Sequence, residues 1–213
     1  MADPSDEPGL ESAYALRTEE DTKRLYRNWA ESYDQDFVAG AAYRHPEIVA
    51  RRYRALGGLW PCLDVGCGTG AVAAHMGPKA LIDGLDLSPE MLAVARRKRL
   101  YRALIEANLK EPLPLDDAAY AGLVSSGTFT HGHVGAEALP ELIRILRPGG
   151  LAVFTVKSDL WEGLGFADAL RALEQDGRIS PPERIREPIY AAVETAPEGH
   201  AGDTGYIVSL TRL

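Results

Sequence analysis

The chain has 213 residues, of which 46% are hydrophobic and 25% are charged, and its formal net charge is -8 at pH 7. This length suits one domain with a sizeable core, and the composition is typical of soluble globular proteins. The acidic balance disfavours a broad electrostatic contact with nucleic acid or with an anionic membrane surface.

No targeting or membrane-spanning segment is visible in the sequence. The stretch MADPSDEPGLESA is acidic and lacks the positive charge and the apolar run of a signal peptide. No apolar run approaches the roughly 20 residues that cross a bilayer. Cys62 and Cys67 match neither a redox CxxC pair nor a metal site, so we expect no bound metal. We therefore expect a cytoplasmic protein without membrane contact, and the oligomeric state stays open.

The first part of the chain is predicted to be a flexible segment followed by helices. Residues 1–18 are rich in Asp, Glu, Pro and Ser, which is typical of a flexible lead-in. Beyond them, Leu25, Trp29 and Tyr33 recur at four-residue spacing and indicate one face of a helix. A second helix is predicted over PEIVARRYRALG. We expect residues 19–57 to form a helical lid.

Short apolar strands then alternate with helices, a pattern typical of a parallel sheet covered on both faces. After these elements come one or two predicted helices and a final pair of strands joined by a polar loop, which indicate a hairpin at the sheet edge. One α/β domain over residues 19–213 is therefore predicted. Its expected strands are 62–66, 80–87, 101–107, 120–126, 151–156, 188–195 and 205–213, and its later helices are 88–99, 138–146 and 159–177.

The stretch CLDVGCGTG follows the first of these strands and places Gly66, Gly68 and Gly70 at alternate positions. Glycines let a ligand approach the backbone closely, and ligands of open α/β sheets bind beyond the carboxyl ends of the strands. The GxGxG spacing differs from the GxGxxG of dinucleotide-binding proteins. Asp64 repels an anion but not an ammonium or sulfonium group. Asp86 ends the second strand, where a carboxylate accepts both hydroxyls of a ribose.

Several motifs together resemble one enzyme family. LDVGCGTG, IDGLDLSPEML, ANLKEPLPLDD, YAGLVSSGTFTH and LPELIRILRPGGLAVFTV lie between Tyr26 and Lys157. They are similar to the motifs of the class I S-adenosylmethionine-dependent methyltransferases. NWAESYDQDF also resembles the small methyltransferase-like proteins named after the Williams–Beuren region. The resemblance implies a Rossmann-like, doubly wound sheet of seven mostly parallel strands with an antiparallel last strand, and S-adenosylmethionine as cofactor.

The resemblance also implies cofactor contacts, residue by residue. The glycine turn would pack against the methionine part of the cofactor, and Asp64 would organise the turn or meet the amino group through water. Asp86 would hold the ribose diol, while Leu87 and Met91 would border the adenine. The turn residues implied in this way are Gly66, Cys67, Gly68, Thr69 and Gly70.

Further contacts are implied outside the turn. Asn108 stands where the family usually has an Asp that binds the adenine amino group, and Leu109 offers a backbone N–H. The amide oxygen of an Asn still accepts that hydrogen bond. Ser125 and Ser126 would lie near the sulfonium. Tyr33 matches a Tyr-Asp pair that in several relatives reaches the cofactor carboxylate.

These roles have structural alternatives. Asp86 would alternatively cap a helix, although Ser88 is better placed to do so. Asn108 would alternatively stabilise only its loop, and Tyr33 would be a core residue on a helix face. The basic run at residues 96–99 is interpreted as a solvated helix end, where cations complement the helix dipole.

Catalytic and acceptor-binding residues are predicted from the segments around the glycine turn. His131 and His133 follow the fourth strand, and either would serve as general base or acceptor anchor, or alternatively as a solvated hydrogen-bonding group. We expect acceptor recognition by residues 158–187 and the N-terminal helix, with Trp161 and Tyr43 lining an apolar pocket. Both aromatic residues would alternatively belong to the core.

The preferred hypothesis is a methyltransferase that acts on a small molecule, because such an acceptor suits the acidic surface and the short chain. SSGT stands where the family's DNA and glutamine methylases carry an NPPY-like tetrapeptide, which disfavours amide or exocyclic amine methylation. No nucleic-acid partner is expected. The alternatives are a protein or RNA methyltransferase, a cofactor-binding regulatory protein without transfer activity, and a nicotinamide dehydrogenase.

Overall fold

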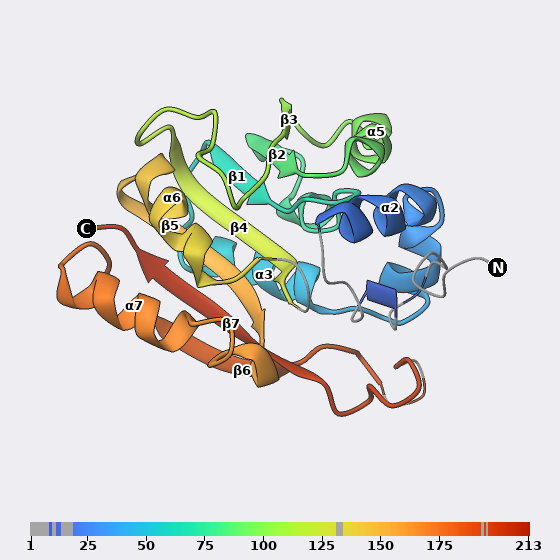
Figure 1. Cartoon of the computed structure of the whole chain (residues 1–213). Coiled ribbons are helices and arrows are strands. Elements are labelled where there is room, and N and C mark those ends of the chain that lie inside the picture. The colour runs from blue at the N-terminus through green and yellow to red at the C-terminus, as the bar shows by residue number, and fades with distance from the viewer. Residues whose placement is uncertain (1–8, 10–11, 14–18, 131–133, 193, 195) are drawn as a thin grey trace.

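One sheet runs through the centre of the molecule, with helices on both of its faces (Figure 1). The computed structural model describes residues 9, 12–13, 19–130, 134–192, 194 and 196–213, and within these ranges the sheet has seven strands. The strands are β1 (Cys62–Val65), β2 (Ile82–Asp86), β3 (Leu104–Glu106), β4 (Tyr120–Phe129), β5 (Leu146–Lys157), β6 (Glu183–Pro188) and β7 (Thr204–Thr211).

The strand order is β3-β2-β1-β4-β5-β7-β6. Neighbouring strands from β3 to β5 are parallel, whereas β7 is antiparallel to both β5 and β6. The order reverses between β1 and β4, and in such sheets a ligand crevice opens beyond the carboxyl ends at this point. The predicted doubly wound α/β fold with an antiparallel last strand is confirmed.

The helices begin and end largely where local signals predict. Ser88 caps α5, because its Oγ accepts a hydrogen bond from the Met91 N–H at 3.2 Å, and Pro89 occupies the first turn. None of the helices in the described ranges is long and apolar enough to cross a membrane. The helical elements are α2 (Glu19–Trp29), η2 (Asp34–Ala39), α3 (His45–Ala55), α4 (Ala73–Met76), α5 (Pro89–Lys98), η3 (Ala136–Ala138), α6 (Leu139–Ile145), η4 (Ser158–Leu160) and α7 (Phe166–Gln175).

The sixth strand was predicted in the wrong place. β6 lies at Glu183–Pro188 rather than at residues 188–195, and most of its side chains are exposed. An edge strand pairs on one side only and tolerates such charged residues. The apolar residues that follow, Ile189 and Tyr190, pack instead against the N-terminal helical residues. Tyr190 also forms an isolated antiparallel bridge with Tyr43.

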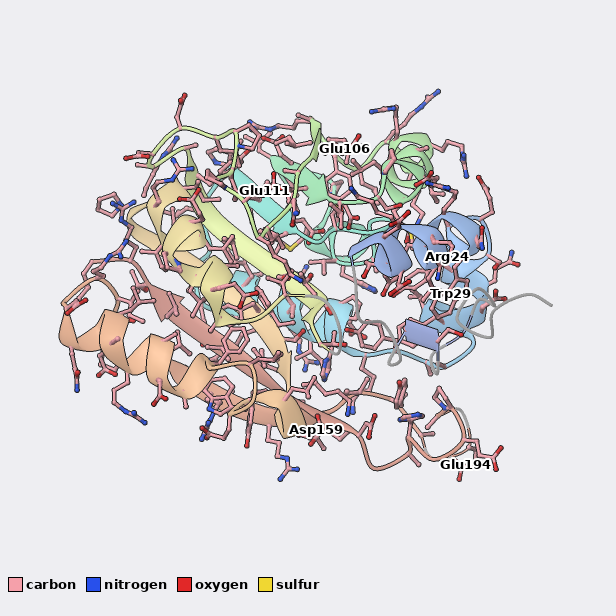
Figure 2. All side chains as sticks on the ribbon, viewed as in Figure 1. Arg24, Trp29, Glu106, Glu111, Asp159 and Glu194 are labelled. Atoms are coloured by element: carbon pink, nitrogen blue, oxygen red, sulfur yellow. The ribbon has the colours of Figure 1, made fainter. Side chains whose placement is uncertain are left out.

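The N-terminal layer, which we define as α2 together with η2, lies beside α5 (Figure 1). Ala30, just after α2, packs on Met91 and Val94 of α5. Figure 2 shows Arg24 and Trp29 within this layer. In the part of the chain that the structure describes, three ion pairs join α5 to the N-terminal segment, namely Arg27–Glu90 at 2.9 Å, Arg97–Glu31 at 2.6 Å and Lys98–Asp34. Part of the basic run at the end of α5 is therefore paired, although exposed ion pairs individually contribute little to stability.

Two apolar clusters enclose the sheet. One contains Tyr53 of α3 with Val153 of β5, and the other contains Phe129, Phe154 and Phe166. Val153 and Phe154 are consecutive in β5 and face opposite clusters, as the two-residue period of a strand requires. The ring centroids are 5.5 Å apart for Phe129 and Phe154 and 5.2 Å apart for Phe129 and Phe166. The central strands of the sheet are therefore buried on both faces.

We expect Phe154→Ala to lower the free energy of unfolding by about 3–5 kcal/mol, because it leaves a cavity between two other phenyl rings. Urea denaturation followed by circular dichroism measures this change. Leu59→Ala is the matched control, since Leu59 is 61% exposed, and its effect should stay within about 0.5 kcal/mol. Equal losses in the two variants would contradict the described core.

Candidate active site

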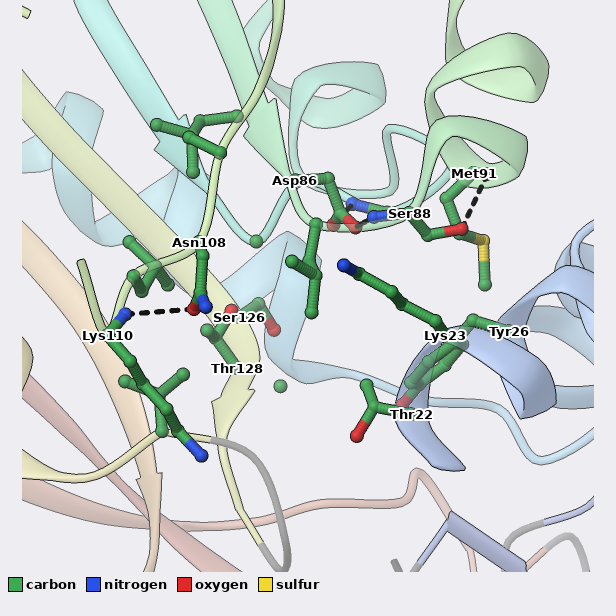
Figure 3. A pocket seen from close by; sticks show the side chains of 18 of the residues that line it. Thr22, Lys23, Tyr26, Asp86, Ser88, Met91, Asn108, Lys110, Ser126 and Thr128 are labelled. Carbon is green, nitrogen blue, oxygen red and sulfur yellow. Dashed lines mark hydrogen bonds between the residues drawn. The ribbon is translucent and has the colours of Figure 1, made fainter. Parts of the chain in front are cut away.

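A cavity of about 870 Å³, including its open mouth, lies beyond the carboxyl ends of the central strands. We call it the strand-end cavity, and it is lined by α2, the glycine turn, the β2–α5 junction, the loop after β3 and the end of β4. Figure 3 shows Asp86 at the β2–α5 junction, Asn108 and Lys110 after β3, and Lys23 and Tyr26 on α2. Open α/β sheets bind their ligands at this place, outside the carboxyl ends of the strands where the strand order reverses.

Asp86 joins the glycine turn to the start of α5. Its Oδ2 accepts the Gly68 N–H at 2.8 Å, and its Oδ1 accepts the Ser88 N–H at 2.9 Å. Desolvation raises the pKa of Asp86, and these backbone N–H groups oppose the shift. Each carboxylate oxygen has a further lone pair for a ligand hydroxyl. Asp86 is therefore a fixed hydrogen-bond acceptor in the cavity wall.

The glycine turn brings bare backbone to the cavity. Gly66 and Gly68 line it with φ values of 64° and 52°, which side-chain-bearing residues rarely adopt. A Cβ at Gly66 would lie 2.1 Å from Thr128 Oγ1, so the ends of β1 and β4 approach closely here. A Cβ at Gly68 would meet no atom within 4 Å. The Gly68 backbone is therefore accessible to a ligand.

β4 is irregular where it passes the cavity. Its register with β5 shifts between Ser125 and Phe129, and Gly127 within this stretch has a φ of 79°. Bulges of this kind redirect side chains and occur next to binding sites. Ser126 lines the cavity, and its Oγ lies 2.9 Å from the Tyr43 hydroxyl. This contact connects the end of β4 with the segment before α3.

Asp64 lies beneath the turn and not in the cavity. Its side chain is fully buried, and Oδ2 accepts a hydrogen bond from the Tyr101 hydroxyl at 2.7 Å. The Tyr101 ring packs against the turn, 3.2 Å from the place of a Cβ on Gly70. Burial raises the pKa of Asp64 to about 7, the Tyr101 hydrogen bond opposes the rise, and the charge of Asp86 adds to it. This placement supports the alternative in which Asp64 organises the turn.

Thr69 connects the turn to the N-terminal layer. Its Oγ1 donates to Asp34 Oδ1 at 2.5 Å, and Asp34 also pairs with Lys98 of α5. Asp34 directly follows Tyr33, which lines the cavity. In this Tyr-Asp pair, Asp34 is hydrogen-bonded to the turn and Tyr33 lies at the cavity.

The structure brings together most of the predicted cofactor contacts. Asp64, Cys67, Thr69, Gly70 and Ser125 do not line the cavity and lie behind its wall. Their contact with the cofactor stays a prediction, as it does for the residues in the wall. The predicted residues that line the cavity are Tyr33, Gly66, Gly68, Asp86, Leu87, Met91, Asn108, Leu109 and Ser126.

Of the predicted catalytic and acceptor residues, Tyr43 lines a cavity beside the first one, and the role of all of them stays a prediction. His131 and His133 lie outside the described residues. Trp161 is buried, stacks on Phe166, and lines neither of the cavities described here. Residues 158–187 likewise contribute no lining residue to these two cavities, and their part in acceptor recognition stays a prediction.

The sequence reasoning missed residues of α2 that line the cavity, namely Thr22, Lys23 and Tyr26. Tyr26 and Tyr33 are seven residues apart, a spacing that places both on the same side of a helix and was an available signal. Figure 3 shows the Lys23 amino group pointing into the cavity, toward the side that carries Asp86. No local pattern distinguishes Lys23 from the surface lysines.

A second cavity, of about 590 Å³, adjoins the first, and we call it the aromatic cavity. Tyr26, Tyr33 and Gly127 line both cavities. A ligand in the strand-end cavity therefore lies next to a ligand in the aromatic cavity. The remaining lining residues are Ala13, Trp29, Phe37, Tyr43, His45, Phe129, Thr130, Thr155, Lys157, Ile189 and Tyr190.

The lining of the strand-end cavity fits a nucleoside. Asp86 offers a carboxylate to a diol, and Leu87 and Met91 offer apolar contacts to a flat base. Asn108 Oδ1 accepts the Lys110 N–H at 3.0 Å, which fixes this amide at the cavity wall. Over the described ranges, no group of three or more His, Cys, Asp or Glu side chains is placed to hold a metal ion.

The chain is similar to known proteins in sequence and in fold. A methyltransferase-domain family model matches residues 63–154. Human methyltransferase-like protein 27 is 37% identical over 164 residues, which cover 72% of this chain and 66% of that protein. Demethylmenaquinone methyltransferase of Chlorobaculum tepidum is 42% identical over 93 residues, covering 42% of this chain and 38% of that protein. The structure of Streptomyces coelicolor geranyl diphosphate C-methyltransferase with S-adenosyl-L-homocysteine has a TM-score of 0.56 at 19% identity, covering 76% of this chain and 74% of that one.

The chain therefore belongs to the class I S-adenosylmethionine-dependent methyltransferases, and S-adenosylmethionine is its cofactor. The bare Gly68 backbone and the fixed Asp86 carboxylate fit this cofactor. The match spans 66% of the human relative and 38% of the Chlorobaculum protein.

We expect Asp64→Asn to flatten the dependence of stability on pH. The Asp64 carboxyl titrates near 3.8 when unfolded and at about 7 when folded. Between these values the folded protein binds more protons, so the free energy of unfolding falls as pH rises, by at most about 1.4 kcal/mol per pH unit for this group. An uncharged Asn removes this contribution, which urea denaturation across the range measures. The exposed control Asp116→Asn should keep the wild-type profile, and parallel profiles for all three proteins would contradict the assignment.

Proposed function

We propose that this chain transfers a methyl group from S-adenosylmethionine to a small-molecule acceptor. The observation that carries the proposal is the shared wall of the two cavities, in which Tyr26, Tyr33 and Gly127 border both. The aromatic cavity beside the cofactor site is lined mostly by aromatic and aliphatic side chains, which suits a small organic molecule. The net charge of -8 also disfavours RNA as the acceptor.

In the proposed complex the cofactor occupies the strand-end cavity. Asp86 accepts the ribose hydroxyls, Leu87 and Met91 border the adenine, and Asn108 accepts a hydrogen bond from the adenine amino group. The Gly68 backbone lies against the methionine part. The support for this pose is that all of these residues line one cavity and that Asp86 is held by two backbone hydrogen bonds.

The cofactor supplies a methyl group already activated by a positive sulfur. The task of the protein is then to orient the acceptor and to exclude water. Tyr26 and Tyr33 cover the shared wall, and burial raises the pKa of both phenols, so they remain neutral. Ser126 and Gly127 form the opposite side, where the Ser126–Tyr43 contact keeps the β4 bulge in place. Tyr26, Tyr33 and Gly127 are the residues that the linings of the two cavities share.

The name of one relative supports a small acceptor. The Chlorobaculum protein is named for demethylmenaquinone, a small molecule, and its match covers 42% of this chain.

Transfer of labelled methyl tests the proposal. The purified protein is incubated with radiolabelled S-adenosylmethionine and, separately, with a metabolite extract, a protein fraction and an RNA fraction. We expect label in low-mass organic products, and heat-inactivated protein is the control. Label confined to protein or RNA would contradict a small-molecule acceptor. Cofactor binding without transfer to any fraction would indicate a regulatory protein that only binds the cofactor.

We expect Asp86→Ala to weaken cofactor binding by about 1.5–3 kcal/mol for each charge-assisted hydrogen bond lost, less what water regains. Asp86→Asn should be intermediate, because only one of its two terminal atoms accepts hydrogen bonds. Calorimetric titration with S-adenosylhomocysteine measures both affinities.

Asp86→Ala also leaves the N–H groups of Gly68 and Ser88 without their carboxylate partner. We therefore expect the free energy of unfolding to fall by about 1–3 kcal/mol as well. Asp116→Ala serves as the control, because Asp116 is exposed. Wild-type affinity in a folded Asp86→Ala protein would restrict Asp86 to a structural role.

A further inference from the structure

We infer that the aromatic cavity is the acceptor site, and that it selects a neutral, flat, largely apolar molecule whose polar group is held by His45 and Trp29. This inference rests on the proposed function, since it needs a cofactor in the adjoining strand-end cavity. It names the acceptor by chemical class and assigns two specificity residues that the motifs of the glycine turn do not indicate.

The first support is a pair of buried polar atoms in the cavity wall. Trp29 Nε1 and His45 Nε2 have no hydrogen-bond partner in the described structure, although the residues are only 3% and 2% exposed. Both residues line the aromatic cavity. A buried polar atom without a partner costs about 1–3 kcal/mol, so such atoms are rare in folded proteins. A ligand hydroxyl suits either atom, because it donates one hydrogen bond and accepts others.

The second support is the state of the His45 ring. Burial lowers the pKa of His45 to about 4, while hydrogen bonds to the backbone of Glu187 and Pro188 oppose the shift. The ring is therefore neutral near pH 7 and has one N–H and one lone-pair nitrogen. Nε2 has no partner in the described structure, so it is the ring nitrogen left for a ligand. Trp29 Nε1 is a donor, and the two together complement a hydroxyl.

The third support is the charge balance of the cavity. Lys157 lines the aromatic cavity, but its ammonium lies 2.7 Å from Asp159 Oδ2 and 3.4 Å from Asp203 Oδ2. These carboxylates neutralise the lysine charge. No surplus positive charge then remains on this side chain to hold a carboxylate or phosphate on the ligand. This balance disfavours an anionic acceptor.

The fourth support is the shape of the walls. The Trp29 and Tyr33 ring centroids are 5.0 Å apart, those of Phe37 and Tyr43 are 5.1 Å apart, and those of Tyr43 and His45 are 5.7 Å apart. Such rings favour a flat ligand that packs face to face or edge to face. Tyr43 bonds to Ser126 at the strand-end cavity, and His45 packs on Tyr43. His45 therefore lines the aromatic cavity next to the ring that contacts the strand-end cavity.

Naphthol is a suitable probe, with naphthoate as its anionic counterpart and methylnaphthalene as the counterpart that makes no hydrogen bond. Binding to the protein saturated with S-adenosylhomocysteine is measured by calorimetric titration. We expect naphthol to bind at least about tenfold more tightly than either counterpart, since one hydrogen bond of about 1.4 kcal/mol corresponds to that factor.

Two substitutions assign the polar contacts. Trp29→Phe keeps a ring but removes Nε1, and His45→Asn keeps a donor near the backbone but removes the atom at Nε2. Each should weaken naphthol about tenfold and leave methylnaphthalene and S-adenosylhomocysteine unchanged. His45→Gln, which carries an amide near the Nε2 position, should restore part of the naphthol affinity. Trp60→Phe and His75→Asn are the matched controls, because neither residue lines the cavity.

The outcomes separate this inference from the proposed function. Equal affinity for the three probes, or no naphthol binding while S-adenosylhomocysteine still binds, would overturn the inference alone. Failure of the wild-type protein to bind S-adenosylhomocysteine would overturn the proposed function. Wild-type naphthol affinity in folded Trp29→Phe and His45→Asn would exclude these contacts. If His45→Asn does not fold, Trp29→Phe decides between the outcomes.

Discussion

The hydrogen bonds that Asp86 accepts from Gly68 and Ser88 are the central constraint of this structure. They join the turn after β1 to the start of α5, where two neighbouring parallel strands end. β1 and β2 pair in register up to Val65 and Leu85. The pairing therefore places the Asp86 carboxylate next to the turn that follows β1. The bare backbone of the turn, the cap of α5 and the cavity wall all take their positions from these contacts.

The N-terminal layer is attached to the same place. Thr69 of the turn donates to Asp34, which also pairs with Lys98, while Ala30 packs on Met91. The N-terminal layer, which lines both cavities, is thus connected to the sheet through the residues that follow β1 and β2. The buried central strands provide a rigid base for the cavities. The N-terminal layer adds aromatic rings to the cavity walls.

The sequence predicts the elements whose signals are local. The apolar strands around the glycine turn and the Ser88 cap are correctly predicted, because periodicity and capping act within a few residues. β6 is misplaced because an edge strand accepts the charged ERIREP, whereas the apolar Tyr190 is needed against the N-terminal layer. Asp64 has the residue type and the position expected of a cofactor contact, but it lies buried beneath the turn. Lys23 lines the cavity because segments distant in the sequence pack together. Contacts between segments that are distant in the chain cannot be predicted from a local sequence pattern.

The wall formed by Tyr26 and Tyr33 has a thermodynamic consequence. Both rings border both cavities, so a ligand in either cavity would contact the same two side chains. Ordering of these rings by one ligand would lower the entropy cost of binding the other, and such a linkage is reciprocal. Cooperativity between cofactor and acceptor would then require no movement of the sheet.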